Sequence, residues 1–283
     1  MSGALPRERP PWLKVHAPSG KGVSRVEEVL RKNGLVTVCR EARCPNVGEC
    51  WGEGTATVLI LGDLCSRACA FCSVASGQPS PPDSTEPARL AAAAAELAWR
   101  HLVVTSVTRD DLPDGGAAQF AQVVKELRQL PRPPSVELLV PDFAGDRDAL
   151  AKVVRARPDI LAHNVETVPR LYSRVRPRAS YERSLALLSR VHATAPGLAL
   201  KSGLMVGFGE TEEEVVGVME DLYATGCRSI TVGQYLSPSR RHLPVTEYLP
   251  VEAFEELASA ARRIGFLRVA SGPFVRSSYR AGS

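Results

Sequence analysis

The sequence predicts an α/β fold in which helices cover a mostly parallel sheet. From Thr57 onward, short β-rich runs alternate with segments of helical periodicity, and such alternation is typical of parallel sheets with helices outside. The chain of 283 residues is long enough for one large barrel domain or two smaller domains. Six strand–helix units suit an open (β/α)6 barrel, a partial TIM barrel with extensions at both ends.

The six expected units occupy most of the chain. Strands are expected at 57–62, 101–107, 135–140, 159–164, 199–206 and 228–235. Helices are expected at 85–99, 116–130, 146–156, 180–194, 211–225 and 251–264. We therefore divide the chain into an N-terminal extension (1–54), a barrel (55–265) and a C-terminal segment (266–283).

The N-terminal extension begins with a segment rich in Pro, Gly, Arg and Lys. Residues 1–22 are expected to form an extended arm, which is either a flexible tail or a docking segment. Trp12 and Leu13 suggest that part of it packs. A helix is expected at 23–32, with Gly34 at its C-terminal cap.

Composition excludes several classes of protein. The formal net charge is +4, and the longest runs of positive charge are pairs such as Arg240-Arg241, so the charge is weak evidence for an acidic partner and none for nucleic acid. No apolar stretch is long enough to span a membrane, and the first residues lack a signal core. Six of the seven cysteines lie between Cys39 and Cys72. We therefore expect a reducing, cytoplasmic compartment, where clustered cysteines indicate metal binding or catalysis more often than disulfides.

Three cysteines follow the first expected strand within eight residues. Cys65, Cys69 and Cys72 place three soft ligands on one loop, and thiolates are the usual ligands of iron–sulfur clusters. Three ligands leave one iron of a four-iron cluster open to a substrate. A zinc site is the alternative, but it needs a fourth ligand, and the next candidates are His101 and Cys227. A third alternative is that these cysteines are small buried side chains, the role we expect for Cys227.

A second cysteine triplet lies upstream, with the spacing C-x4-C-x5-C. Cys39, Cys44 and Cys50 match neither a zinc ribbon nor the spacing of the first triplet, so two separate clusters are the simpler interpretation. Pro45 and Asn46 favour the turns that a loop needs to wrap a metal centre.

These motifs resemble those of a known family. The C-x3-C-x2-C loop, with Phe71 before its last cysteine, resembles the signature of the radical S-adenosylmethionine (SAM) superfamily. With the upstream triplet and the closing run Arg276-Ser277-Ser278-Tyr279, nearly the whole chain resembles the lipoyl synthase family. The resemblance implies a [4Fe–4S] cluster on Cys65, Cys69 and Cys72 that binds SAM. It also implies a second, auxiliary [4Fe–4S] cluster on Cys39, Cys44 and Cys50, completed by Ser278, with Ser277 as the alternative.

Two strand ends carry candidate SAM-binding residues. Gly115 and Gly116 open a helix, where backbone groups can approach a ligand closely, although the same residues fit an ordinary turn. The resemblance implies that this turn binds the SAM amino group. His163, Asn164 and Glu166 are polar in an apolar stretch, so they either cap a helix or face a pocket. For His163, a hydrogen-bonded structural role is an equal alternative.

The fifth expected strand carries three further candidates. Gly207 and Gly209 follow it and would let a flat adenine approach the backbone, as the resemblance also implies. Lys201 either neutralises a carboxylate in the pocket or extends to the surface. Thr211 and Glu214 fit a capping box at the start of the next helix.

The resemblance also implies a reaction and its partners. SAM is reductively cleaved to a 5′-deoxyadenosyl radical, which abstracts hydrogen from carbons 6 and 8 of an octanoyl group. The auxiliary cluster gives one sulfur to each carbon. The implied partners are an octanoylated lipoyl carrier protein or lipoyl domain, a ferredoxin or flavodoxin as electron donor and an iron–sulfur carrier, with no nucleic acid and no membrane. The alternatives are another radical SAM sulfur-inserting enzyme, similar to biotin synthase, and a zinc-stapled binding module.

Overall fold

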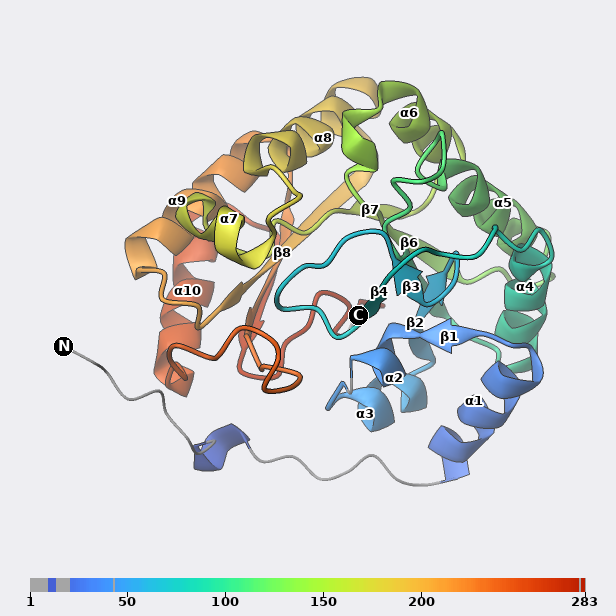
Figure 1. The fold of residues 1–283 in the computed structure, drawn as a ribbon, viewed down its shortest axis with the longest axis horizontal. Coiled ribbons are helices and arrows are strands. Elements are labelled where there is room, and N and C mark those ends of the chain that lie inside the picture. The colour runs from blue at the N-terminus through green and yellow to red at the C-terminus, as the bar shows by residue number, and fades with distance from the viewer. Residues whose placement is uncertain (1–9, 14–20, 43, 280, 283) are drawn as a thin grey trace.

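The fold is organised around a sheet of parallel strands that curves into an incomplete barrel (Figure 1). The computed structural model describes residues 10–13, 21–42, 44–279 and 281–282. Neighbouring strands of the main sheet follow the chain order. They are β2 (Thr55–Ile60), β5 (His101–Ser106), β6 (Ser135–Leu139), β7 (Ile160–Ala162), β8 (Ala199–Val206), β9 (Ser229–Gln234) and β10 (Arg268–Gly272).

Two smaller features extend this sheet. β1 (Val36–Thr37) pairs antiparallel with β2 and forms one edge, while β10 forms the other. β3 (Leu64–Cys65) and β4 (Ala75–Ser76) form a separate pair at the two ends of the loop that carries Cys65, Cys69 and Cys72. In the part of the chain that the structure describes, β1 and β10 do not pair, so the barrel is open between them.

Helices cover the outside of the barrel, as Figure 1 shows. After each of the first six parallel strands a helix returns the chain: α4 (Glu86–Glu96), α5 (Ala117–Arg128), α6 (Arg147–Arg155), α8 (Tyr181–Thr194), α9 (Glu212–Ala224) and α10 (Val251–Ile264). Shorter elements are η1 (Pro11–Leu13), η2 (Phe143–Gly145), η3 (Pro169–Leu171) and α7 (Tyr172–Val175). Thr211 and Glu214 form the predicted capping box of α9.

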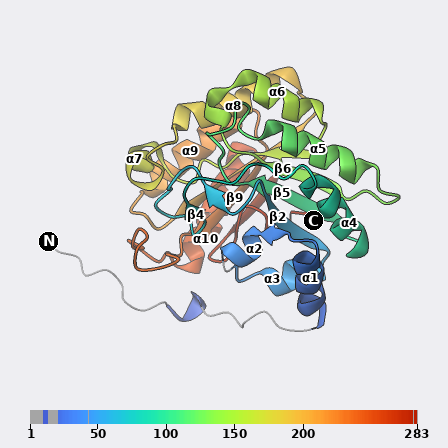
Figure 2. The ribbon, with the colours of Figure 1, turned by 45° about the vertical axis from the view of Figure 1, so that its right-hand side comes forward.

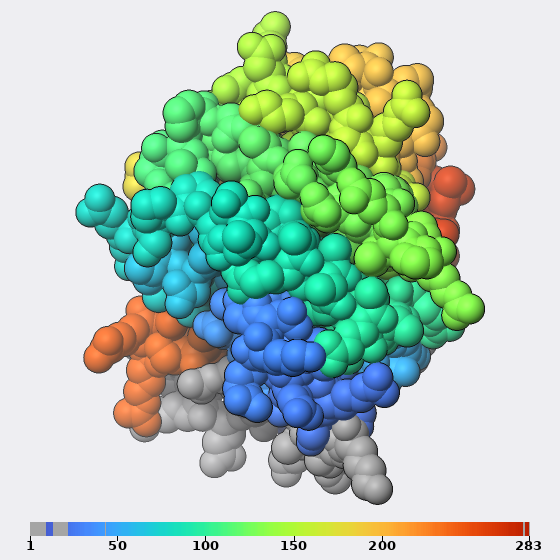
Figure 3. Space-filling view, turned by 90° about the vertical axis from the view of Figure 1, so that its right-hand side faces the viewer, coloured from blue at the N-terminus to red at the C-terminus, as the bar shows by residue number. Residues whose placement is uncertain are grey.

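The N-terminal extension packs against the β1–β2 edge (Figures 1 and 2). It contributes α1 (Lys21–Lys32), α2 (Val38–Glu41) and α3 (Val47–Gly52). Val26, Val29 and Leu30 are buried, as the helical periodicity predicts. Figure 3 shows α1 lying beside α4, where Lys32 pairs with Glu96 at 3.3 Å.

The two faces of the strands differ in polarity. Leu102 and Leu138 are fully buried and belong to the apolar core under the helices. On the other face, Lys201 of β8 pairs with Glu137 of β6 at 2.9 Å, and His101 Nε2 lies 3.6 Å from Glu137 Oε2. Because β7 separates β6 from β8 in the sheet, this contact spans the inside of the barrel. The outer layer is therefore apolar, and the interior is polar.

The C-terminal segment, residues 273–279 and 281–282, turns back across the open side of the barrel. Arg276 Nη1 donates to the Gln234 carbonyl of β9 at 3.4 Å, and Thr57 Oγ1 of β2 donates to Ser278 Oγ at 2.8 Å. A methyl group added at Gly282 would lie 2.8 Å from His101 Cβ of β5. The last residues therefore lie within the ring of strands, where Figure 1 marks the C-terminus.

The predicted fold class is confirmed, and the twelve expected strands and helices occur within a few residues of their predicted bounds. The sequence analysis missed β10, a short half-buried strand, and the helices α2 and α3. Leu13 is buried, as expected for a packed part of the arm, whereas most of residues 1–22 lie outside the described residues. The division at residues 54 and 265 stays a proposal, because β1 and β10 join both extensions to the sheet.

We predict that Leu138→Ala destabilises the protein by about 2–5 kcal/mol, because it removes a fully buried side chain and leaves a cavity. Leu267→Ala is the matched control, since Leu267 is 81% exposed, and it should change stability by less than about 0.5 kcal/mol. Urea unfolding followed by circular dichroism measures both. Equal effects of the two changes would contradict the layer assignment.

Candidate functional site

The first cysteine loop lies over the carboxyl ends of the parallel strands, where barrel enzymes hold their active sites. It follows β2 and is bound by the loops of other units. Ala70 N donates to the Val175 carbonyl at 3.0 Å, and Leu243 N donates to the Ala70 carbonyl at 3.1 Å. His242 Nε2 lies 3.0 Å from the Cys72 carbonyl oxygen. The loop is thus held from several sides before any ligand binds.

The three thiols of this loop lie close enough to influence one another. Cys65 Sγ accepts hydrogen bonds from the backbone N–H groups of Arg67 and Thr108, at 3.4 and 3.3 Å. Burial raises the pKa of Cys69, and burial together with the charges of Cys69 and Cys65 raises the pKa of Cys72 to about 12. The thiols of Cys69 and Cys72 are therefore protonated at neutral pH when no cluster is bound. Binding a cluster must therefore release protons.

Arg67, between the first two cysteines, holds the loop to its neighbours. Its guanidinium donates to both oxygens of Asp110, at 2.7 and 2.8 Å, and to Asp142 Oδ1 at 2.8 Å. Burial alone would raise the pKa of Asp142, but the hydrogen bond and charge of Arg67 hold it below its usual range. A buried arginine with two carboxylates therefore links the cysteine loop to the loops after β5 and β6.

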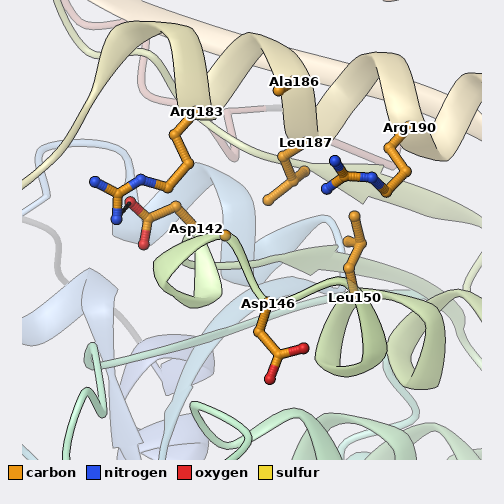
Figure 4. Close-up of a pocket in the computed structure, with 8 residues that line it drawn as sticks. Asp142, Asp146, Leu150, Arg183, Ala186, Leu187 and Arg190 are labelled. Carbon is orange, nitrogen blue, oxygen red and sulfur yellow. Dashed lines mark ion pairs between the residues drawn. The ribbon is translucent and has the colours of Figure 1, made fainter.

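A cavity outside the barrel, between α6 and α8, touches the same network (Figure 4). Arg183 points toward Asp142, with Nη1 3.5 Å from Oδ2, and Arg190 lies further along α8. None of the predicted ligands lines this cavity. We therefore do not assign it to the reaction.

Polar groups gather beside Cys69 at the end of β7. Asn164 Nδ2 donates to Glu166 Oε1 at 3.0 Å, and Arg176 Nη1 donates to the Asn164 carbonyl at 2.9 Å. Burial raises the pKa of Glu166, and the charge of Arg176 opposes this effect. Asn164 Oδ1 and Arg176 Nε are buried without a hydrogen-bond partner in the structure. Because such groups are costly to leave unpaired, they suit a polar ligand.

The sequence analysis did not predict Arg176, Asp142 or Arg67 as site residues. Arg176 lies twelve residues after Asn164, beyond α7, so no local pattern connects the two. The only available sequence signal for Arg67 was its position between two clustered cysteines.

His163 has a structural role, one of its two predicted alternatives. Nδ1 lies 2.8 Å from the Val140 carbonyl oxygen, and Nε2 lies 2.9 Å from Ser184 Oγ of α8. Burial, with the nearby charge of Arg176, lowers the His163 pKa from 6.5 to about 4. The ring is therefore neutral and faces the helix layer rather than the cysteine loop.

The predicted glycines have left-handed backbone conformations and lie against protein atoms. Gly116 has a φ of 89°, and an added Cβ would clash with Leu61. Gly207 has a φ of 111°, and an added Cβ would lie 2.7 Å from the Glu247 carbonyl oxygen. Gly115 and Gly209 also have positive φ. These turns require glycine for their geometry, and SAM contacts at them stay a prediction.

The structure does not bring Lys201 to the cysteine loop. It lies near the amino end of β8, is 7% exposed, and pairs with Glu137. The sequence left two roles open, a carboxylate partner in the pocket or an exposed position. The structure supplies a carboxylate partner, but that partner is Glu137, which lies inside the barrel and not at the cysteine loop.

A second cavity, which we call the auxiliary cavity, contains the other predicted ligands. Cys39, Cys44, Cys50 and Ser278 line it together with Thr57, Arg276 and Tyr279. Asn46 Nδ2 donates to the Phe274 carbonyl at 2.8 Å, and Tyr279 OH donates to Glu49 Oε1 at 3.2 Å. These contacts join the N-terminal triplet to the C-terminal segment. The donors expected for the auxiliary cluster therefore share one cavity, although they come from opposite ends of the chain.

The donor chemistry of this cavity suits an iron–sulfur cluster. Burial raises the pKa of both Cys39 and Cys44, and the two thiols repel each other as thiolates. Within the described ranges, no three His, Cys, Asp or Glu side chains close on a single metal ion. Three thiols and a hydroxyl around a cavity thus fit a multi-iron group, which the chain would hold through Cys39, Cys44, Cys50 and Ser278.

Comparisons with known proteins give the family. The model of the radical SAM superfamily matches residues 59–222, and the model of the N-terminal domain of lipoyl synthase matches residues 4–44. A lipoyl synthase from Caldanaerobacter subterraneus is 54% identical over 273 residues, which cover 96% of this chain and 95% of that protein. One from Methylococcus capsulatus is 53% identical over 277 residues, covering 98% and 86%. The chain belongs to the lipoyl synthase family.

Solved structures support the fold of this member of the lipoyl synthase family. SuiB from Streptococcus suis, bound to its precursor peptide, matches with a TM-score of 0.61 at 9% identity, over 87% of this chain and 52% of that one. Methylornithine synthase (PylB) matches with a TM-score of 0.55 at 14% identity, over 89% and 74%. Family membership also confirms the predicted cofactors, SAM and [4Fe–4S] clusters, whereas the ligand assigned to each iron stays a prediction. Within the described residues, no helix has the length and apolarity to cross a bilayer.

The lowered pKa of His163 predicts a pH dependence of stability. Between pH 6.5 and about 4 the unfolded chain binds a proton at this residue and the folded chain does not, so stability falls as the pH falls, by about 3 kcal/mol in total. Urea unfolding over this pH range measures the loss. His163→Gln should flatten the dependence, and His192→Gln, at an exposed position of α8, should keep it. The same pH slope in all three proteins would contradict the assignment.

Proposed function

We propose that this chain is a lipoyl synthase that inserts sulfur at carbons 6 and 8 of an octanoyl group linked to a lysine of a carrier domain. One observation carries the proposal beyond family membership: Ser278 lines the same cavity as Cys39, Cys44 and Cys50, next to a barrel that holds a separate cysteine triplet. A radical SAM enzyme with a single cluster would have no need for this second set of donors.

The two sites divide the work of the reaction. When bound, SAM and the cluster on Cys65, Cys69 and Cys72 supply a 5′-deoxyadenosyl radical, and the auxiliary cluster supplies sulfur. The chain's own residues position the reactants. Asn164, Glu166 and Arg176 offer polar atoms for SAM at the carboxyl end of β7. The helix-covered wall of the barrel limits access of water and other C–H bonds to the radical.

Ser278 is suited to a ligand that is lost during turnover. Its Oγ accepts a hydrogen bond from Thr57, which stabilises the oxygen when it does not bind iron. A hydroxyl oxygen is also a poorer match to iron–sulfur chemistry than a thiolate. Ser278 would therefore hold a cluster that supplies sulfur through a donor that is released more readily than the three thiolates.

The proposed partners follow from this reaction. An octanoylated carrier domain supplies the substrate, a ferredoxin or flavodoxin supplies electrons, and an iron–sulfur carrier rebuilds the consumed cluster. The free cysteines of both triplets support a reducing, cytoplasmic location.

Iron content tests the proposal. Anaerobically reconstituted protein should contain about eight irons per chain, the sum of two four-iron clusters. A variant with Cys39, Cys44 and Cys50 changed to alanine should keep about half of the iron and still cleave SAM. With an octanoylated lysine peptide, only the unaltered protein should give a product that has gained two sulfur atoms. Zinc in place of iron, or cleaved SAM with intact octanoyl peptide, would refute the proposal.

We predict that Ser278→Ala keeps SAM cleavage but blocks sulfur insertion, because the auxiliary cavity loses one donor while the first cysteine loop is unchanged. Cys69→Ala should abolish cleavage. Ser277→Ala is the matched control and should keep both steps. Product masses and the yield of 5′-deoxyadenosine measure the two steps separately. Equal loss of cleavage in the Ser278 and Cys69 variants would contradict the division of labour, and loss of insertion in the Ser277 variant would reassign the ligand.

A further inference from the structure

Arg276 brings a positive charge to the auxiliary cavity without a carboxylate partner. Its side chain lines the cavity together with Cys39, Cys44 and Cys50. Its described hydrogen bonds go to backbone carbonyls, from Nη1 to Val275 at 2.7 Å and to Gln234 at 3.4 Å. None of the ion pairs found among the described residues involves Arg276. Carbonyl oxygens carry only partial charge, so the cation is not neutralised.

The two arginines that are fully buried among the described residues have acidic partners, whereas Arg276 is half-buried. Arg67 pairs with Asp110 and Asp142, and Arg109 pairs with Asp111 at 2.8 Å. Removing a cation from water is costly unless an opposite charge compensates. The charge of Arg276 is therefore compensated only when the cavity contains negative charge.

The proposed occupant of the cavity has that charge. Three cysteines bind iron as thiolates, and each reduction of a cluster adds another negative charge. Net charge near a cluster is one of the factors that set its reduction potential. A fixed cation stabilises the more negative, reduced state and so raises the potential.

We propose that Arg276 is the positioning residue that supplies the counter-charge of the auxiliary cluster. This inference rests on the proposed function. Arg276 lies two residues before Ser278 on the same segment, so the oxygen ligand and the cation reach the cavity together. The Asn46 and Tyr279 contacts hold this segment against the cysteine triplet. Displacing the segment would remove a ligand and the compensating charge in one movement.

Two substitutions separate charge from hydrogen bonding. Arg276→Lys keeps the charge, whereas Arg276→Gln keeps a donor for the Gln234 carbonyl but loses the charge. Both are made in the full chain with Cys65, Cys69 and Cys72 changed to alanine, so that only the auxiliary cluster is observed. A redox titration followed by electron paramagnetic resonance gives the midpoint potential, and iron release to a chelator gives the stability of the cluster.

The glutamine variant should have a more negative midpoint potential and release iron several-fold faster, and the lysine variant should stay close to its parent. A glutamine variant that matches the parent in both measurements would overturn the inference. Equal shifts in the two variants would also overturn it, because they would indicate a structural role through the carbonyl contacts. If the glutamine variant binds no cluster, retention of the cluster by the lysine variant supports the inference, and failure of both overturns it.

The parent protein distinguishes failure of this inference from failure of the proposed function. A parent that binds no iron at all refutes the auxiliary cluster and, with it, the role of Arg276. A parent that binds about four irons, with an unaffected glutamine variant, refutes only the role of Arg276.

Discussion

The hydrogen bond between Thr57 and Ser278 joins the first parallel strand to the last turn of the chain across 221 positions of sequence. It spans the side on which the barrel remains open, between the β1 and β10 edges. A closed barrel would leave no gap for the C-terminal segment to enter. The incomplete barrel thus creates the place where the N-terminal cysteine triplet and Ser278 meet, and the second cavity depends on that gap.

The charged groups inside this protein fall into two sets: those that pair with an opposite charge and those that lack a full partner in the protein. On the barrel floor, Lys201 and Glu137 neutralise each other, and at the carboxyl ends Arg67 is held by two carboxylates. At the two cysteine sites, in contrast, polar atoms of Asn164 and Arg176 and the charge of Arg276 lack full compensation from the protein. Compensated pairs hold the scaffold in place, whereas the incomplete ones mark where ligands carrying charge belong.

Much of the fold could be predicted because its signals are local. The alternation of short apolar runs with helical segments located the strands from Thr55 to Gln234. The capping box located the start of α9. β10 escaped prediction because its five residues, an arginine followed by Val, Ala, Ser and Gly, give little periodicity. The role of Lys201 could not be decided from sequence, since its partner Glu137 is 64 residues away. Arg176 was missed for the same reason: the folded loops, and no spacing, bring it to Asn164.

The cavity shared by Cys39, Cys44, Cys50 and Ser278 has a consequence for how the protein is made. A ribosome releases the cysteine triplet before the barrel strands and Ser278 after them, while earlier parts of a chain begin to fold during synthesis. The loop of Cys65, Cys69 and Cys72 is complete long before that point. The position of Ser278 therefore orders biogenesis: the auxiliary site can be closed only after all the strands of the barrel have left the ribosome.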